Sequence, residues 1–301
     1  MTICTLTLSP ALDIEYHAKA VSVGLNRARE HQISAGGKGI NVSRAILACM
    51  RADSDPPKIG LCTVAPLGGS VGQMLADLCA AEGLPVSAVP IAENTRVNVS
   101  LIPDRGSSLE INAPGTPIGN TFPRITEECL RDLGPGDVLV IAGSCPSDVP
   151  KSAPSVLVGL AKERGITAVL DCDGDALRLA TEADILPDLI KPNSDEIAAL
   201  TDVSPDARDA LADAALSLGI GTVIVTCAGD GAILAADGRA AFHPTVKRPV
   251  VRLKGAGDTF LGAYVWARYA KKLPAEEAVR FAQNIAGDYV SGQPGGPGGA
   301  R

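Results

Sequence analysis

Short apolar runs alternate with amphipathic stretches along most of the chain, and this alternation limits the fold more than any other feature. The runs "DVLVIAG" (137–143), "GITAVLD" (165–171), "DLIKPN" (188–193) and "GTVIVTCA" (221–228) indicate buried strands. The segments 70–84 and 206–219 have the apolar spacing of helices, and the second ends at a glycine. Strands that alternate with helices form a mostly parallel sheet covered by helices on both faces. We therefore expect a doubly wound α/β fold.

Two segments break this alternation. Residues 12–34 and 93–112 alternate apolar and polar positions with period two, most clearly in "TRVNVSLI" (95–102). Period-two strands have one polar face, so these segments are expected to pair into a small separate sheet that forms a lid over the ends of the main strands. Apart from this lid, residues 1–301 are expected to form a single α/β domain. The Gly- and Pro-rich end, "SGQPGGPGGAR" (291–301), is expected to be mobile.

Composition excludes several functional classes. A formal charge of -7 argues against nucleic-acid binding, so an anionic ligand must be held by a local basic pocket. No run of about 18 apolar residues occurs, and the N-terminus lacks a secretory signal, so we expect a cytoplasmic protein. The eight cysteines stand singly and the chain has only three histidines, which indicates reduced core thiols rather than metal ligands or nucleophiles.

The segment "KGAGDTFLGAYVWARYAKK" (254–272) places a Gly-rich turn directly before a helix pattern. Main-chain N–H groups of Gly255, Ala256 and Gly257 could point at an anion there, with the helix dipole adding to the attraction. Asp258 follows in the first turn, where a carboxylate can accept the proton of a hydroxyl that attacks a phosphoryl group. The alternative is that Asp258 caps the helix and the glycines only form a turn.

A second Gly-rich element, "SAGGKGINVSRAIL" (34–47), also precedes a helix pattern. The helix dipole disfavours a cation at that end, which argues against a merely solvated lysine at position 38. Together, "GGKGINVSRA" and "GAGDTF" resemble the two signatures of the ribokinase-like, or PfkB, family of sugar kinases, and the similarity runs from Ser9 to about Ser291.

Within that family, "SPALD" (9–13), "TRVNV" (95–99) and "INAPG" (111–115) resemble the hexose-phosphate branch, which includes 1-phosphofructokinase. The resemblance implies an ATP-dependent kinase, with fructose 1-phosphate as the preferred acceptor. Tagatose 6-phosphate and fructose 6-phosphate are close alternatives. A kinase for an unphosphorylated sugar or nucleoside, and a non-catalytic sensor of sugar phosphates, also remain open.

The resemblance further implies an acceptor site built from the first Gly-rich element and the lid. Asp13 and Asn41 would hydrogen-bond hydroxyls of the sugar, because a carboxylate accepts and an amide both donates and accepts. Lys38 and Arg96 would face the phosphate already present on the sugar, which suits the planar donor fork of arginine. The other positions that the resemblance assigns to the acceptor site are Arg27, Gly36, Gly37, Asn98, Gly143 and Ser144.

On the nucleotide side, the resemblance implies ATP and Mg²⁺, with a monovalent cation as a further candidate. Asn193 and Glu196 match an N-x-x-E element in which Glu196 would hold Mg²⁺ through water. Glu196 could also stabilise the helix start through the dipole. The other nucleotide positions implied are Lys191, Thr226, Gly229, Gly231 and Asn284. Unpaired lid edges and the resemblance together lead us to expect a homodimer through the lid.

Four positions depart from the family pattern. Ser9 stands where the branch usually has asparagine, and Ala228 stands where a glycine is common. Lys254, with Leu253, replaces the valine and small polar residue that usually precede the anion-binding turn. Ala228 and Lys254 are expected on the nucleotide side, where they would alter ATP affinity.

Overall fold

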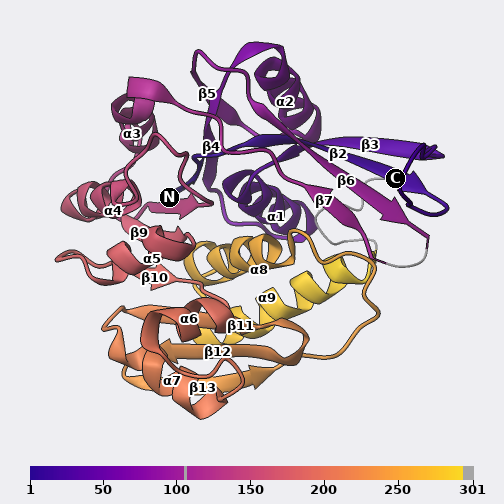
Figure 1. The fold of residues 1–301 in the computed structure, drawn as a ribbon. Helices are drawn as coiled ribbons and strands as arrows, with labels where there is room; N and C mark the ends of the chain where they lie inside the picture. Colours follow the sequence, from indigo (N-terminus) through magenta and orange to yellow (C-terminus); the bar gives the residue numbers. More distant parts are fainter. Residues whose placement is uncertain (105–106, 294–301) are drawn as a thin grey trace.

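The body of the molecule is one large twisted sheet flanked by helices (Figure 1). The computed structural model describes residues 1–104 and 107–293. Nine strands follow one another in the order β13-β12-β11-β10-β9-β8-β1-β4-β5. Strands β11 to β5 in this order pair in parallel, whereas β12 and β13 are antiparallel. This confirms the predicted doubly wound α/β class. The strands are β1 (Thr2–Thr7), β4 (Gly60–Leu67), β5 (Val86–Pro90), β8 (Val138–Ala142), β9 (Thr167–Asp171), β10 (Leu189–Ile190), β11 (Thr222–Cys227), β12 (Gly231–Ala236) and β13 (Arg239–Pro244).

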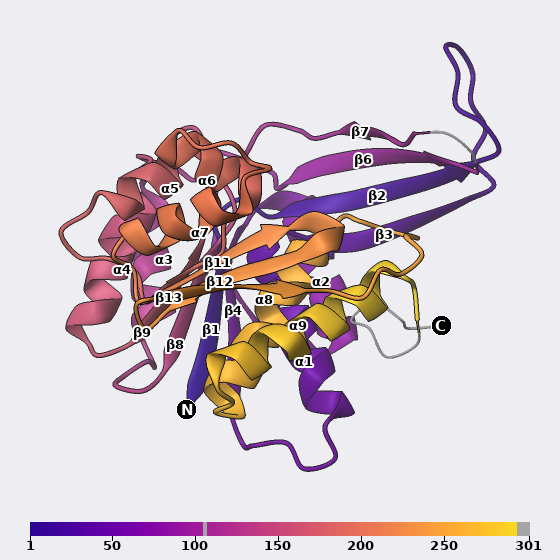
Figure 2. The same ribbon diagram turned by 90° about the horizontal axis from the view of Figure 1, so that it is seen from below.

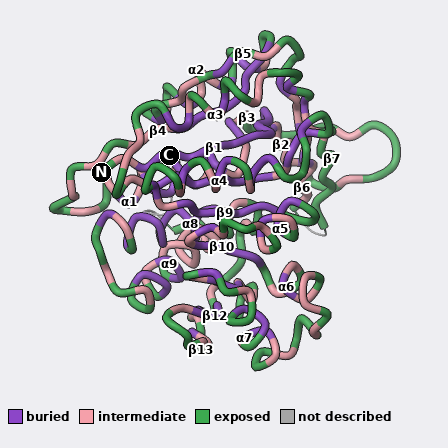
Figure 3. The backbone as a smooth tube through the Cα atoms, turned by 90° about the vertical axis from the view of Figure 1, so that its left-hand side faces the viewer, coloured by how far each residue is buried: buried purple, intermediate pink, exposed green. Residues whose placement is uncertain are grey.

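Helices pack on both faces of this sheet, and Figure 3 shows the buried residues concentrated along the strands between them. One face carries α1 (Lys38–Ala52), α8 (Ala256–Val265) and α9 (Ala275–Val290). The other carries α3 (Phe122–Leu130), α4 (Ala153–Glu163), α5 (Gly174–Thr181), α6 (Ser194–Thr201) and α7 (Arg208–Ser217). Helix α2 (Gly69–Glu82) packs with α1 and β4 in a smaller cluster. Short non-α turns occupy Gly119–Thr121, Ala228–Asp230 and Trp266–Ala270.

The predicted elements recur with small shifts. The four apolar runs form β8, β9, β10 and β11, and the two helix patterns form α2 and α7. On α2, Leu75 is buried, as are Gly72 and Cys79. Met74 is 44% exposed. An added Cβ at Gly72 would be 3.0 Å from the Leu67 carbonyl carbon, so α2 packs closely against the end of β4 there.

A second sheet confirms the predicted separate lid sheet. Its order is β3-β2-β6-β7, and its strands are β2 (Ala11–Ala18), β3 (Glu30–Gly36), β6 (Arg96–Pro103) and β7 (Leu109–Ile111). Strand β2 begins just after the carboxyl end of β1, and Figure 2 shows the lid extending beyond the body from there. Because the other parallel strands end at the same edge, the lid stands where α/β proteins bind their ligands.

Three further expectations concern the cysteines, membrane-spanning helices and the C-terminal end. All eight cysteines lie within the described residues and none forms a disulfide, which agrees with the reduced thiols predicted. Among the described residues, no helix is both long enough and apolar enough to span a bilayer. The end predicted to be mobile lies mostly outside the described residues, which stop at Gln293.

Candidate active site

The N-terminus of α8 forms an anion-binding end of the kind the sequence indicates. Gly255 is the N-cap residue with a φ of 84°, and an added Cβ there would lie 2.8 Å from the Tyr289 hydroxyl, so only glycine fits. The Ala256 N–H already donates to the Leu253 carbonyl at 3.0 Å. The N–H groups of Gly257 and Asp258 belong to the first turn, which has no intrahelical acceptors for them. These two groups are therefore the ones available to an anion.

Asp258 is buried beside them, with 8% of its surface exposed. Its Oδ2 accepts a hydrogen bond from Asn41 Nδ2 at 2.7 Å. The Asn41 side-chain oxygen Oδ1 in turn accepts from Arg44 at 2.6 Å, and Arg44 pairs with Glu82 at 2.5 Å. A continuous polar chain thus leads from the end of α2 through α1 to α8. The sequence placed Asn41 against the sugar, but in the structure both ends of its amide are engaged within this chain.

The pKa of the Asp258 carboxyl is raised. Burial is the main cause, the negative charge of Asp171 adds to it, and the Asn41 hydrogen bond with the charges of Lys191 and Lys38 opposes it. A carboxylate with a raised pKa is a stronger base. The site therefore favours proton acceptance by Asp258.

Asp171, the last residue of β9, is a site residue that the sequence analysis missed. It is 2% exposed, and its Oδ1 lies 3.4 Å from Lys191 Nζ and 3.7 Å from Lys38 Nζ. Its Oδ2 is buried with no hydrogen-bond partner among the described residues. An acidic residue at the carboxyl end of a predicted strand was the signal that could have identified it.

Lys38 therefore lies among carboxylates on the body side. Burial alone would lower its pKa, but the field of Asp171 and Asp258 outweighs burial, so the pKa of Lys38 is raised and the ammonium stays charged. Gly143 lies beside Lys38. It has a φ of 99°, and an added Cβ there would lie 3.7 Å from Lys38 Cβ. Ser144 follows and is partly exposed. Both N-terminal helix ends, of α1 and α8, thus meet at the carboxyl edge of the sheet.

Asp13 is the central carboxylate on the lid side. It is 9% exposed on β2, and its Oδ1 accepts from Asn98 Nδ2 at 2.9 Å across the strand pair β2–β6. Its Oδ2 lies 2.9 Å from Lys254 Nζ. Gly36 on the neighbouring strand leaves room for this carboxylate, because a Cβ there would be 2.5 Å from Oδ2. The structure thus brings together Asp13 and Asn98, two positions that the resemblance assigns to the acceptor site, and adds Lys254, which was expected on the nucleotide side.

Arg96 extends the lid side with a positive charge that has no ion-pair partner in the described part of the chain. Its guanidinium donates to the carbonyls of Ala113 at 2.8 Å and Ser9 at 3.1 Å. Burial lowers its pKa, while the nearby Asp13 charge opposes that shift. Two carbonyls thus fix the orientation of a cation whose charge is available to an anion.

Gly37 is the N-cap residue of α1 and has a φ of 134°. An added Cβ there would lie 2.5 Å from Thr7 Cγ2, so no side chain fits at this position.

Most of the predicted nucleotide residues lie at or just after the carboxyl ends of β10 and β11. Asn193 and Glu196 form a reciprocal capping box at the start of α6, with both hydrogen bonds at 2.8 Å. Thr226 lies beside this segment, since its N–H donates to the Pro192 carbonyl at 2.9 Å. Gly229 borders open space, and Asn284 is exposed on α9. The capping box shows that Glu196 stabilises the start of α6, which was the alternative role considered for it.

Gly231 and Ala228 have backbone features of their own. Gly231 has a φ of 145°, and a Cβ there would be 2.2 Å from the His243 carbonyl oxygen, so packing alone requires glycine. Ala228 has a φ of 46°, in the left-handed region that favours glycine. The family's preference for glycine at this position has a local conformational reason.

Arg27 is not brought to the site within one chain. It is exposed on the loop between β2 and β3, and none of the hydrogen bonds or ion pairs among the described residues involves it. Figure 2 shows this loop projecting away from the body. An acceptor contact by Arg27 would need a movement of the loop or a second copy of the chain.

The described residues offer oxygen donors to a metal ion, but they do not form a complete set of ligands. No group of three or more His, Cys, Asp or Glu side chains in the described residues could hold an ion. Mg²⁺ bound to a nucleotide takes most of its ligands from phosphates and water, so it requires few protein groups. The unpartnered Asp171 Oδ2 and the Glu196 carboxylate fit such an ion, both being hard oxygen donors.

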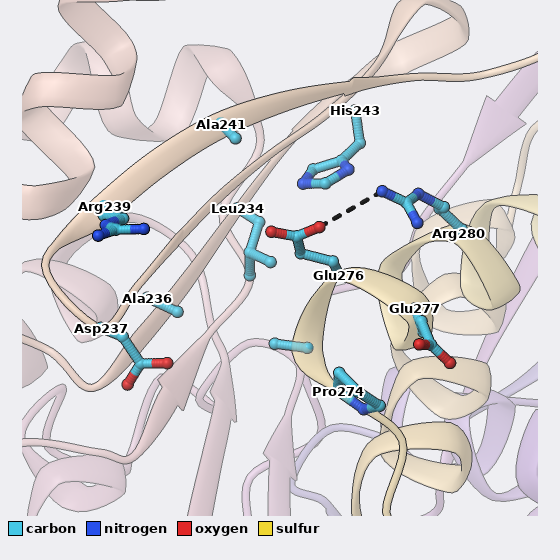
Figure 4. Close-up of a pocket in the computed structure, with 11 residues that line it drawn as sticks. Leu234, Ala236, Asp237, Arg239, Ala241, His243, Pro274, Glu276, Glu277 and Arg280 are labelled. Atoms are coloured by element: carbon cyan, nitrogen blue, oxygen red, sulfur yellow. Dashed lines mark hydrogen bonds and ion pairs between the residues drawn. The ribbon is translucent and has the colours of Figure 1, made fainter.

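A separate hollow of about 560 Å³ lies between the β12–β13 hairpin and the start of α9 (Figure 4). Its walls carry charges of both signs, including an ion pair of Glu276 with Arg280 at 3.3 Å. None of the predicted site residues lines it. The constellation around Asp258 and Asp13, not this hollow, contains the reactive groups.

Comparison with known proteins identifies a family whose model matches most of the chain. The model of the pfkB family carbohydrate kinases matches residues 9–293. The chain is 33% identical over 283 residues to a 1-phosphofructokinase of Bacillus subtilis, covering 93% of this chain and 89% of the relative. It is 30% identical over 287 residues to the ATP-dependent 6-phosphofructokinase isozyme 2 of Escherichia coli, with coverages of 93% and 89%.

Solved structures agree as well. Phosphofructokinase-2 from Escherichia coli in complex with fructose-6-phosphate superposes with a TM-score of 0.84 at 28% identity, covering 96% of this chain and 93% of that one. A structure of the same protein in complex with potassium gives a TM-score of 0.86 at 28% identity, with coverages of 98% and 94%.

Proposed function

Since the chain belongs to the pfkB family of carbohydrate kinases, we propose that it transfers the terminal phosphoryl group of ATP to a primary hydroxyl of a ketohexose phosphate. The observation that carries this proposal is the position of Asp258. Its buried carboxylate, with a raised pKa, lies in the same helical turn as the unpaired N–H groups at the start of α8. A base and an anion-binding group side by side are what phosphoryl transfer to an alcohol needs.

In the proposed reaction, Asp258 accepts the proton of the sugar hydroxyl while that oxygen bonds to the γ-phosphorus. The bond from the γ-phosphorus to the bridging oxygen breaks, and ADP leaves with that electron pair. The N–H groups of Gly257 and Asp258 stabilise the charge on the transferred group. General-base catalysis of this kind contributes roughly 10² to 10⁴ in rate.

We assign Lys38 and Lys191 to the transferred phosphoryl group. Both ammonium groups share Asp171 as a partner. The carboxylates that most raise the pKa of Lys38, Asp171 and Asp258, both lie on the body side of the site. This placement favours contact with the donor phosphates over the phosphate that arrives on the sugar. The latter is assigned to Arg96, whose charge has no carboxylate partner in the described part of the chain.

Asp13 and Asn98 are proposed to bind hydroxyls of the acceptor. Fructose 1-phosphate, phosphorylated at its 6-hydroxyl, is the preferred acceptor, supported by the 1-phosphofructokinase relative. Fructose 6-phosphate and tagatose 6-phosphate are the alternatives, because a ketohexose with a phosphate at one end has nearly the same outline in either direction. A sensor without activity is less well supported, since such a protein would have no need of a buried base at the anion site.

The nucleotide is proposed to lie along Asn193, Thr226, Gly229 and Asn284. Glu196 and Asp171 would hold Mg²⁺ through water, and the ion would neutralise charge on the phosphates when bound. The potassium complex of the Escherichia coli relative makes a monovalent cation a candidate activator here.

Two copies are proposed to pair through the lid, whose outer strand exposes Leu109 (49%) and Ile111 (58%). The proposed location is the cytoplasm, where ATP is available.

A panel of sugars and sugar phosphates, assayed for ADP release with Mg-ATP, tests this function. The proposal predicts that fructose 1-phosphate, or another ketohexose phosphate, gives kcat/KM at least tenfold above any unphosphorylated sugar or nucleoside. Preference for an unphosphorylated acceptor would contradict it, as would the absence of turnover with every member of the panel.

A further inference from the structure

Lys254 links the two halves of the site. It directly precedes Gly255, the N-cap residue of the anion-binding helix α8, and its ammonium lies 2.9 Å from Oδ2 of Asp13 on the lid strand β2. Its side chain is 39% exposed, so it borders the space that a ligand would enter. The cation therefore stands between the proposed acceptor carboxylate and the end of α8.

The backbone at Lys254 is held in place from α9. The Tyr289 hydroxyl donates to the Lys254 carbonyl at 2.7 Å. Arg252 stacks over the Tyr289 ring at 4.2 Å and donates to the Tyr289 carbonyl at 3.0 Å. This double contact fixes the segment 252–254, so the ion pair with Asp13 begins from an anchored backbone.

The charges around Asp13 explain why a cation is needed there. Asp13 would otherwise present a buried negative charge to an anionic sugar phosphate. The lysines of the body side, Lys38 and Lys191, already share Asp171, and Arg96 is oriented by two carbonyls. Lys254 is the ammonium that balances Asp13 directly. One of its three N–H donors faces Asp13, which leaves others for an oxygen of the ligand.

We propose that Lys254 is a specificity-determining residue of the acceptor site, which favours a phosphorylated over an unphosphorylated sugar by neutralising Asp13 and donating to the anionic acceptor. This inference rests on the proposed sugar-phosphate kinase function and names the residue that sets its acceptor class. A neutral sugar gains much less from the added positive charge, so the effect of Lys254 appears as a difference between the two acceptors.

Three variants separate this function from a structural one. Lys254→Met removes the charge and keeps most of the side-chain length, and Lys254→Arg restores a cation. Lys58→Met is the matched control, because Lys58 is exposed in the loop between α1 and β4 and forms no ion pair among the described residues. Each variant is assayed with fructose 1-phosphate and with fructose, and equilibrium binding of fructose 1-phosphate and of a non-hydrolysable ATP analogue is measured by calorimetry.

Lys254→Met is expected to weaken binding of fructose 1-phosphate about tenfold or more, as for the loss of a charged hydrogen bond, and to raise its KM more than it lowers kcat. Binding of the ATP analogue should change less than about twofold, and Lys254→Arg should recover most of the loss. The ratio of kcat/KM for fructose 1-phosphate over fructose should fall by a similar factor. Lys58→Met should match the wild type.

Three results would overturn the inference. Equal losses for both acceptors would mean that Lys254 only holds Asp13 in place. A loss confined to the ATP analogue would return Lys254 to the nucleotide side, and unchanged binding of fructose 1-phosphate would remove it from the site. Where fructose gives no turnover, the salt dependence of KM for fructose 1-phosphate decides, because it should flatten in Lys254→Met only if the charge acts on the acceptor. A wild-type protein inactive with every ketohexose phosphate would instead refute the proposed function.

Discussion

Asn41 donates from Nδ2 to Oδ2 of Asp258 at 2.7 Å, and this hydrogen bond orients the proposed base. The direction of the amide is fixed by its other end. Arg44 can only donate, so the Asn41 oxygen must face Arg44 and the Asn41 amino group must face Asp258. The Oδ1 of Asp258 is thereby left for the hydroxyl of the acceptor. Asn41 is in this arrangement a positioning residue for the base.

Replacing Asn41 with leucine should therefore change the pH dependence of the reaction. The Asn41 hydrogen bond lowers the pKa of Asp258, so its loss should raise that pKa further. Asp258 accepts a proton only when ionised, and activity falls as pH drops through its pKa. The acid limb of the profile of kcat/KM against pH should move to higher pH in Asn41→Leu, with a lower plateau.

Asp171→Asn should move the same limb in the opposite direction. The negative charge of Asp171 raises the pKa of Asp258, so removing that charge should lower it. Opposite shifts in the two variants would be hard to explain by general damage to the site. If the acid limb stayed at its wild-type position in both Asn41→Leu and Asp171→Asn, the limb would report the titration of a group other than Asp258.

Arg96→Ala should discriminate between phosphorylated and free acceptors. The guanidinium has no carboxylate partner in the described part of the chain, so its charge is available to the phosphate of the sugar. We expect kcat/KM for fructose 1-phosphate to fall at least about 100-fold, the upper range for a charged hydrogen bond, and turnover of an unphosphorylated sugar to persist. A melting curve of the variant controls for the lost contacts to Ser9 and Ala113. Equal loss with both acceptors would count against the assignment.

Two substitutions, one in the turn after β11 and one at the first residue of β12, should change stability with opposite signs. Ala228 has a φ of 46°, and a left-handed alanine costs about 1 kcal/mol relative to glycine, partly offset by the greater freedom of glycine in the unfolded chain. Ala228→Gly should therefore raise Tm by about 2 °C at most. Gly231→Ala should lower Tm by several times as much, because its Cβ would be 2.2 Å from the His243 carbonyl oxygen. A rise in Tm for Gly231→Ala would show that the loop adapts more freely than the structure indicates.

Features encoded in a continuous stretch could be predicted from the sequence. The alternation of apolar runs and helix patterns identified β8 to β11, and the period-two segments identified the lid, because both depend on neighbours along the chain. The anion-binding start of α8 is also local, since the Gly-rich turn and Asp258 adjoin each other. Gly255 could also be identified from the Gly-rich turn in its own segment. The side chain that excludes a Cβ at this position, Tyr289, lies on another helix.

Contacts between distant segments could not be predicted. Asn41 and Asp258 are separated by 217 positions, and nothing in either stretch indicates that they hydrogen-bond. Lys254 was recognised as unusual, yet its neighbours in sequence belong to the anion-binding turn and its partner Asp13 belongs to the lid. The direction in which a long flexible side chain points depends on packing across the two sheets. For the same reason Lys38, expected against the sugar, lies with Asp171 in the structure.

The measurement that tests the central claim most directly compares wild type and Asp258→Asn with Mg-ATP and fructose 1-phosphate, after calorimetry has shown that the variant binds both ligands. Loss of the proposed base predicts a fall in kcat of roughly 10² to 10⁴, with dissociation constants within a few-fold of wild type. A kcat within about threefold of wild type would contradict the assignment of Asp258 as the base that deprotonates the sugar.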